Sequence, residues 1–195
     1  ATVVQWEPGR YGENWLDTCF DNVTRAMEID PDDAEVHRIL GAIRMFKREF
    51  DASLFHHEKA RDLCPSDPYI RFKYATVLIY TGDSERALEE IKVAKRLDPF
   101  CPDYLLEDEG ICYYWLNNFE EAVESFNKLK VPTRNSLFYL AATFSKKGGA
   151  NEAKASLAEA ISVSNLTISD FINTQYYKSE DNISSLRMTL EGIAA

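Results

Sequence analysis

Apolar residues recur along most of this chain at intervals of three and four positions, which is the spacing of one face of an α-helix. Leu88, Ile91 and Ala94 show this spacing clearly. Residues that favour turns separate such stretches, among them Gly82-Asp83 and Asp98-Pro99, and proline cannot continue a helix. The pattern therefore predicts an all-α fold of short helices joined by tight turns.

A repeat with a period close to 34 residues organises these helices. In each repeat a small residue lies in the first helical stretch, another follows twelve residues later, and a further, mostly small residue follows seven positions after that. Two antiparallel helices approach closely only where the side chains between them are small, so these positions indicate helix crossings. The three sets are Gly41, Ala75, Gly110 and Ala141; Ser53, Ala87, Ala122 and Ala153; and Ala60, Ala94, Leu129 and Ala160.

The period, the small residues and the prolines that close units, Pro65 and Pro99, resemble the tetratricopeptide repeat (TPR) family over about residues 13–164. The resemblance implies a right-handed superhelical solenoid of helix-turn-helix repeats with a C-terminal capping helix. The sequence departs from the family pattern at Arg44 and Leu78, where an aromatic residue is usual, and in a shortened third unit. The predicted organisation is an irregular lead-in at 1–12, a half repeat at 13–33, four TPR units at 34–164 and C-terminal cap helices at 165–195.

The two ends of the array are atypical. The half repeat matches only the second helix of a unit, so its partner helix lies upstream in a longer protein or is replaced by Trp6 and Tyr11. At the other end a short turn and a helix cover the last apolar face of the solenoid. The residues expected on packed faces are Phe20, Val23, Ala26 and Ile29 in the half repeat and Phe171, Ile183, Leu186 and Leu190 in the cap.

The resemblance places partner contacts on the concave face, which the first helix of each unit lines. This face is rich in aromatic side chains, with cations towards one end and anions further along. Aromatic residues are favoured at recognition surfaces, although we expect part of these rings to pack between units instead. The protein-binding residues predicted on this face are Arg38, Phe46, Tyr69, Phe72, Lys73, Thr76, Tyr80, Tyr104, Glu107, Asp108 and Tyr114.

The partner expected on this face is a protein segment other than an acidic chaperone tail. TPR domains that clamp such tails carry Lys, Asn and Arg at set positions. The matching positions here read Arg38 and Ala42, then Lys73, then Tyr104 and Asp108. A mixed or apolar peptide, or a helix laid in the groove, fits this set better.

The cluster most suggestive of chemistry is His56-His57-Glu58. Adjacent helical residues point about 100° apart and cannot chelate one metal, so we expect His57 to pack between helices and His56 to face away. Glu107-Asp108-Glu109 is interpreted as an acidic helix surface, and Asp30-Pro31-Asp32-Asp33 lacks the glycine and closing glutamate of a calcium loop. We therefore expect no catalysis, no metal and no cofactor in this chain.

Charge and composition exclude further classes of function. The formal net charge of −10 disfavours nucleic-acid binding, which requires clustered Lys and Arg. No apolar run approaches the roughly 18 residues that span a bilayer, and the start does not resemble a signal peptide. We therefore expect a cytoplasmic fragment with free thiols and no membrane contact, and the sequence leaves a homodimer open.

A narrower resemblance covers roughly residues 84–192. Leu97-Asp98-Pro99-Phe100-Cys101-Pro102-Asp103-Tyr104 and the ending Ile168-Ser169-Asp170-Phe171 to Leu190-Glu191-Gly192 look like the C-terminal TPR domains of proteobacterial class III adenylate/guanylate cyclases. That resemblance implies a regulatory or partner-binding part of a larger signalling protein. Two alternatives remain: the sensor half of a winged-helix transcription regulator, and a small-ligand binder or cryptic enzyme.

Overall fold

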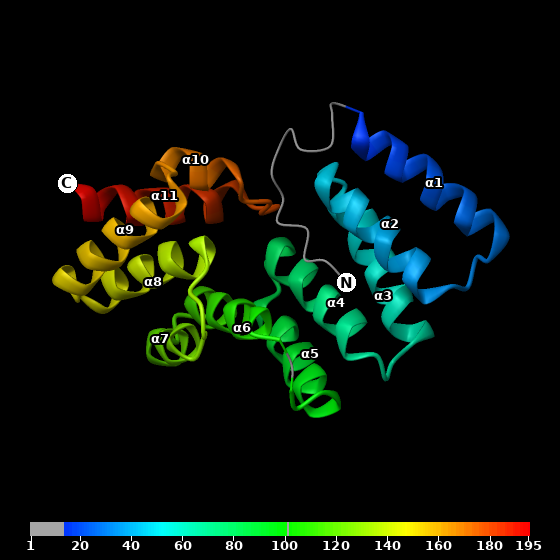
Figure 1. Cartoon of the computed structure of the whole chain (residues 1–195), viewed down its shortest axis with the longest axis horizontal. Helices are drawn as coiled ribbons and strands as arrows, with labels where there is room; N and C mark the ends of the chain where they lie inside the picture. The colour runs from blue at the N-terminus through cyan, green and yellow to red at the C-terminus, as the bar shows by residue number, and fades with distance from the viewer. Residues whose placement is uncertain (1–13, 101) are drawn as a thin grey trace. The chain divides into compact units, whose positions relative to one another are not determined.

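The computed structural model describes residues 14–100 and 102–195, and all regular structure in these ranges is α-helical. The lead-in with Trp6 and Tyr11, as well as Cys101, lies outside the described residues. Figure 1 shows the order of the helices. They are α1 Trp15–Ile29, α2 Ala34–Phe46, α3 Phe50–Leu63, α4 Pro68–Thr81, α5 Ser84–Leu97, α6 Tyr104–Trp115, α7 Phe119–Asn127, α8 Arg134–Lys147, α9 Ala150–Ser164, α10 Ile168–Asn173 and α11 Glu180–Ala194.

The helices form two compact units, α1–α3 and α4–α11. In the first unit α2 and α3 form a helical hairpin, and α1 packs against α2. In the second unit the hairpins α4–α5, α6–α7 and α8–α9 follow one another, and each packs against the next. The first helices of these hairpins contact each other in turn, α4 with α6 and α6 with α8. This consecutive packing of helical hairpins confirms the predicted fold class.

The small residues of the repeat lie at the helix crossings. All twelve members of the three sets are buried, as the 34-residue period predicts. A Cβ atom added to Gly110 would lie 2.5 Å from Cε1 of Phe126, so a larger residue at this crossing of α6 and α7 would force the Phe126 ring to shift. In the first unit, Ser53 Oγ donates a hydrogen bond to the backbone oxygen of Gly41 at 2.8 Å and joins α3 to α2 at the equivalent crossing.

Aspartates begin several helices and glycines end two of them. Asp33 accepts a hydrogen bond from the Val36 amide at 2.9 Å, and Asp67 accepts from the amide of Ile70 at 3.0 Å. These contacts satisfy amides that have no partner within the first turn of a helix. Gly82 ends α4 with φ of 95°, a left-handed conformation that favours glycine. The turn predicted at Gly82-Asp83 therefore lies between the end of α4 and the start of α5.

The packed face of α1 differs from the prediction. Val23 is buried against the core of the first unit, and Leu16, Phe20 and Met27 pack around it. Leu16, Phe20, Val23 and Met27 are spaced four, three and four positions apart, so they form one stripe along the helix. Ile29 lies outside this stripe. Ile29 is 86% exposed, so its assignment to the packed face is wrong.

The C-terminal helices cover the last hairpin. α11 packs against both α8 and α9, and α10 packs against α11. Phe171 of α10 stacks on Phe138 of α8, with ring centroids 4.1 Å apart and ring planes at 11°. Phe171, Leu186 and Leu190 are fully buried, as predicted for a cap, whereas Ile183 is only partly buried.

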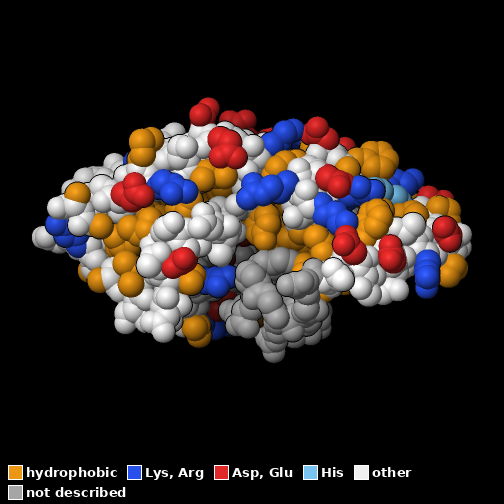
Figure 2. Space-filling view, turned by 90° about the horizontal axis from the view of Figure 1, so that it is seen from above, with side chains coloured by type: hydrophobic (Ala, Val, Ile, Leu, Met, Phe, Trp, Pro, Cys, Tyr) orange, Lys and Arg blue, Asp and Glu red, His pale blue; other side chains and the backbone are white. Residues whose placement is uncertain are grey.

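The surface mixes the two signs of charge. Acidic and basic side chains are interspersed over the face shown in Figure 2. Two of the large exposed apolar side chains are Phe55, on α3, and Phe100, on the connection after α5. In the part of the chain that the structure describes, no helix is both long enough and apolar enough to cross a membrane.

Candidate protein-binding face

The candidate site lies on the second unit and is formed by one side of α4, α6 and α8, which we call the first-helix face. Pro68 begins α4, and Tyr69, Phe72, Lys73, Thr76 and Tyr80 follow at helical spacing along one stripe of the helix. On α6 the corresponding stripe begins at the first residue of the helix, Tyr104, and continues through Glu107 and Asp108. Two regions of this face differ in what fills them.

The first region, the pocket end, is formed by Tyr69, Phe72, Lys73 and Tyr104. The rings of Phe72 and Tyr104 lie with centroids 4.5 Å apart and planes tilted by 34°. Lys73 Nζ lies 4.6 Å from the Phe72 centroid, 5.3 Å from that of Tyr69 and 5.7 Å from that of Tyr104. These distances are those of cation–π interactions. The ammonium group is thus held among three aromatic rings.

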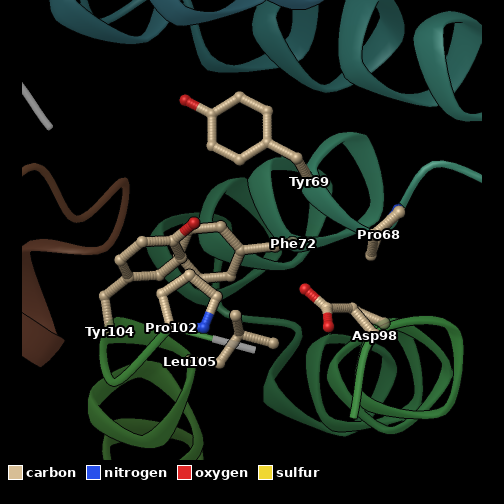
Figure 3. A pocket seen from close by; sticks show the side chains of 8 residues that line it. Pro68, Tyr69, Phe72, Asp98, Pro102, Tyr104 and Leu105 are labelled. Atoms are coloured by element: carbon tan, nitrogen blue, oxygen red, sulfur yellow. The ribbon is translucent and has the colours of Figure 1, made fainter. Parts of the chain in front are cut away.

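A pocket of about 100 Å³ opens beside these rings. Figure 3 shows Phe72 and Tyr104 on one side of it and the carboxylate of Asp98 across from them. This volume is well below the roughly 300 Å³ at which pockets hold drug-sized ligands or cofactors, so the pocket accommodates a single side chain. It is lined by Pro68, Tyr69, Phe72, Ala94, Asp98, Pro102, Tyr104 and Leu105.

Two carboxylates lie partly buried further along the face. Asp108 Oδ2 accepts a hydrogen bond from Thr76 Oγ1 at 2.7 Å, which connects α6 to α4. Burial, together with the charge of Glu107, raises the pKa of Asp108 to about 7 against the lowering effects of Thr76 and Lys73. Glu107 accepts hydrogen bonds from Thr133 Oγ1 and Asn135 Nδ2, and burial raises its pKa as well.

The third carboxylate of this run does not lie on an acidic surface. Glu109 is 8% exposed, and both its oxygens accept from Lys95 Nζ at 2.9 and 3.0 Å. It also accepts a hydrogen bond from Ser125 Oγ at 3.3 Å. The interpretation of the run as an open acidic surface is therefore wrong for Glu109, because a cation on α5 draws it inward.

The second region, the filled end, is formed by Tyr80, Trp115 and Tyr139. Here Tyr177, from the non-helical connection between α10 and α11, is 1% exposed. Trp115 Nε1 donates a hydrogen bond to Tyr177 Oη at 2.8 Å, and the hydroxyls of Tyr139 and Tyr177 lie 2.5 Å apart. The Tyr177 ring centroid is 5.1 Å from that of Tyr80 and 5.2 Å from that of Trp115. The chain thus fills this end with its own side chain.

The predicted residues are distributed unevenly between surface and interior. Phe72 and Tyr114 are 4% and 3% exposed, so they belong mainly to the packed core, and burial raises the pKa of Tyr114 to about 12. Arg38 and Phe46 belong to the first unit. Arg38 Nε donates to Glu35 Oε2 at 2.7 Å, and the Phe46 ring contacts that of Trp15 at 6.1 Å.

Tyr139 and Tyr177 were absent from the predicted set. Tyr139 occupies the same position in its repeat as Lys73, so extending the mapping to the fourth repeat would have found it. Tyr177 lies outside the repeats and follows no periodic pattern. The other residues that line the pocket were also missed, namely Pro68, Ala94, Asp98, Pro102 and Leu105.

The histidines also differ in part from the prediction. His57 is 2% exposed and packs between the helices, as predicted. His56 does not face away, because its Nδ1 lies 2.9 Å from Nδ1 of His37 on α2. Burial, together with the neighbouring His37 and Arg44, lowers the pKa of His56 to about 4. Within the described ranges, no group of three or more His, Cys, Asp or Glu residues is placed to hold a metal ion.

The solved structures that align with this chain include TPR proteins. PilW, a type IV pilus biogenesis factor, aligns with a TM-score of 0.73 at 15% identity over 91% of this chain and 82% of its own. TTC0263, a thermophilic TPR protein of Thermus thermophilus, aligns with a TM-score of 0.66 at 20% identity over 92% and 90% of the two chains. YrrB, a TPR protein with an unusual peptide-binding site, aligns with a TM-score of 0.60 at 19% identity over 78% and 79%. The chain therefore has the TPR fold.

Comparison with models of protein families finds no match for this sequence, and comparison with curated proteins finds none either.

Proposed function

We propose that this chain is a protein-interaction module that binds a segment of another protein along its first-helix face. The observation that carries the proposal is the pocket between α4 and α6, with Phe72 and Tyr104 on one side and Lys73 held beside them. Exposed apolar pockets beside positioned charges are typical of sites where a partner side chain is anchored. The unusual peptide-binding site named for YrrB supports the proposal by analogy of fold.

The electrostatics of the face favour a partner of mixed character. The pocket takes an apolar side chain and is lined by the carboxylate of Asp98, and the carboxylate of Asp108 lies further along the first-helix face. An acidic tail would bring like charge towards carboxylates that are already partly buried, which is unfavourable. A segment with an apolar anchor and a basic or neutral flank therefore fits better than an acidic chaperone tail.

In the whole protein, we propose that the array is the regulatory or partner-binding part of a larger signalling protein. The resemblance of residues 84–192 to the TPR domains of nucleotidyl cyclases supports this role. A winged-helix transcription regulator is the alternative, since such proteins also carry TPR arrays. Reading the gene upstream of residue 1 separates the two.

The experiment begins with peptides selected from a random display library against the whole chain. Their affinities are then measured in solution for Lys73→Glu, Tyr104→Ala and a matched charge reversal, Lys92→Glu, on the exposed side of α5. We expect Lys73→Glu and Tyr104→Ala to weaken binding about tenfold or more, because both remove part of the anchor site. Lys92→Glu leaves the affinity unchanged, and circular dichroism verifies the helix content of each variant.

Selected peptides that bind the wild type and both pocket variants equally would show that the binding surface lies elsewhere.

A further inference from the structure

The connection between α10 and α11 includes a short non-helical stretch, residues 175–178, which we call the tail segment. It returns from the cap to the first-helix face of α4, α6 and α8. The Lys178 amide donates a hydrogen bond to the backbone oxygen of Tyr80 at 2.8 Å, close to the C-terminal end of α4. The last carbonyls of a helix lack partners within the helix, so this contact is one that a bound peptide could equally make.

The side-chain contacts of the tail segment are also ones that a bound peptide could make with the first-helix face. Tyr177 inserts among Tyr80, Trp115 and Tyr139, which come from three successive first helices. Tyr80 is one of the residues predicted to contact a partner, and Tyr139 occupies the repeat position of Lys73. The tail segment therefore uses the part of each repeat that the predicted binding face uses.

We propose that the filled end is a recognition site for a non-helical segment carrying a tyrosine, and that the tail segment occupies it as a tethered ligand. A tyrosine-bearing segment of a partner replaces the tail segment there. This inference rests on the proposed function and names the chemistry of the partner. Recognition consists of a ring packed between Tyr80 and Trp115, and of a hydroxyl bonded to the Trp115 indole and the Tyr139 hydroxyl.

Tethering explains why a competitor must be strong. A linked segment is present at an effective concentration of about 1 mM, so a free segment displaces it only when it binds much more tightly than that. Removing the Tyr177 side chain lifts this competition. It also removes the hydrogen-bond partner of the partly buried Trp115 N–H and of the buried Tyr139 hydroxyl, a cost that a tyrosine supplied from solution relieves.

The test uses the whole chain and a synthetic peptide with the sequence of residues 174–179, Thr-Gln-Tyr-Tyr-Lys-Ser, acetylated and amidated at its ends. We expect Tyr177→Ala to bind this peptide saturably, at least about tenfold more tightly than the wild type does, because its own ligand is missing. The matched control is Tyr176→Ala. The Tyr176 ring meets Tyr80 edge-on at 6.3 Å and is only partly buried, so its removal leaves Tyr177 in place and binding as weak as in the wild type.

The peptide itself supplies the second control. Replacing its second tyrosine by phenylalanine removes one hydroxyl and is expected to weaken binding roughly five- to tenfold, the value of one hydrogen bond. Replacing the same tyrosine by alanine abolishes binding. A Tyr177→Ala chain with the wild-type helix content that does not bind the peptide would overturn the proposal and leave the tail segment a purely structural part of the cap.

A second measurement tests the proposal in the case that Tyr177→Ala does not fold. Hydrogen exchange is followed in the wild type and in Tyr177→Phe, which keeps the ring. A tethered ligand opens without unfolding the helices, so we expect the Lys178 amide to exchange faster than the amides of α8, and Tyr177→Phe to accelerate Lys178 alone. Equal exchange rates at Lys178 and throughout α8 would overturn the proposal. The outcome of these two tests at Tyr177 does not affect the binding test at Lys73 and Tyr104. The proposed function and this inference can therefore be refuted independently of each other.

Discussion

The pocket end and the filled end of the first-helix face are built from the same helices and from similar rings, yet they present different surfaces. At the pocket end Phe72 and Tyr104 stand beside a space of about 100 Å³. At the filled end Tyr177 occupies the space between Tyr80, Trp115 and Tyr139. Aromatic composition alone therefore does not identify a binding site. The two ends differ in whether a side chain of the same chain fills the space beside the aromatic rings.

The largest expected effect is a difference between the two ends in how much stability is lost when an aromatic ring is removed. Tyr177→Ala removes a fully buried ring and is expected to destabilise the chain by about 3–5 kcal/mol, as for other buried aromatic residues. Tyr104→Ala removes a partly exposed ring at the pocket end and is expected to cost about 1–2 kcal/mol. Urea unfolding followed by circular dichroism measures both. Equal losses would contradict the difference in packing between the two ends.

The next effect concerns Asp108. Its pKa is about 7 in the folded chain and 3.8 when unperturbed, so the folded state binds the proton more tightly. The contribution of Asp108 to stability is then fully present below about pH 4 and is lost as the pH rises towards 7, because the partly buried carboxylate becomes charged beside Glu107. Lys73 and Thr76 offset only part of that cost.

Asp108→Asn is therefore expected to raise the free energy of unfolding by about 2 kcal/mol at pH 8 and to leave it unchanged near pH 4. Thermal unfolding at the two pH values measures the difference. The control is Asp98→Asn, since Asp98 lies at the edge of the pocket and, among the described residues, accepts a hydrogen bond from the local amide of Phe100. A loss of stability at pH 8 on replacing Asp108 would show that the charged carboxylate is well compensated.

The smallest effect concerns the cation at the pocket end. Lys73→Met keeps an unbranched apolar stem but removes the ammonium group, and is expected to cost about 0.5–1 kcal/mol, the value of partly exposed cation–π contacts. Lys92→Met on the exposed side of α5 is expected to change stability by less than about 0.5 kcal/mol. Chemical unfolding of both variants tests this. If Lys73→Met loses no more stability than Lys92→Met, the contacts between the Lys73 ammonium group and the rings make no net contribution to stability.

The sequence predicted the helices and the crossing positions well because both depend on local, periodic features. Gly110 and Ala75 could be placed at crossings because a helix pair cannot tolerate large residues there. Ile29 was misplaced because two stripes of α1 are apolar, and the sequence of α1 does not show which of them contacts α2. His56 was misplaced because its direction depends on the position of His37 in the neighbouring helix.

The candidate site could be predicted only in part. Repeat positions identified Tyr69, Lys73 and Tyr104 at the pocket end. They could not reveal the filled end, because Tyr177 lies 38 residues from Tyr139 and 62 from Trp115 in a stretch without periodicity. Long-range docking of a non-helical segment leaves no pattern in a single sequence. Nor does the sequence show that Glu109 is drawn into an ion pair with Lys95.

The most direct test of the central claim maps where a selected peptide binds. A peptide obtained by display against the whole chain is titrated into the isotope-labelled protein, and backbone amide shifts are followed by NMR. We predict that the largest changes occur at Tyr69, Lys73 and Tyr104, with Lys92 on the opposite side of the hairpin unaffected. Changes confined to the exposed faces of α5, α7 and α9 would contradict the assignment of the first-helix face as the binding surface.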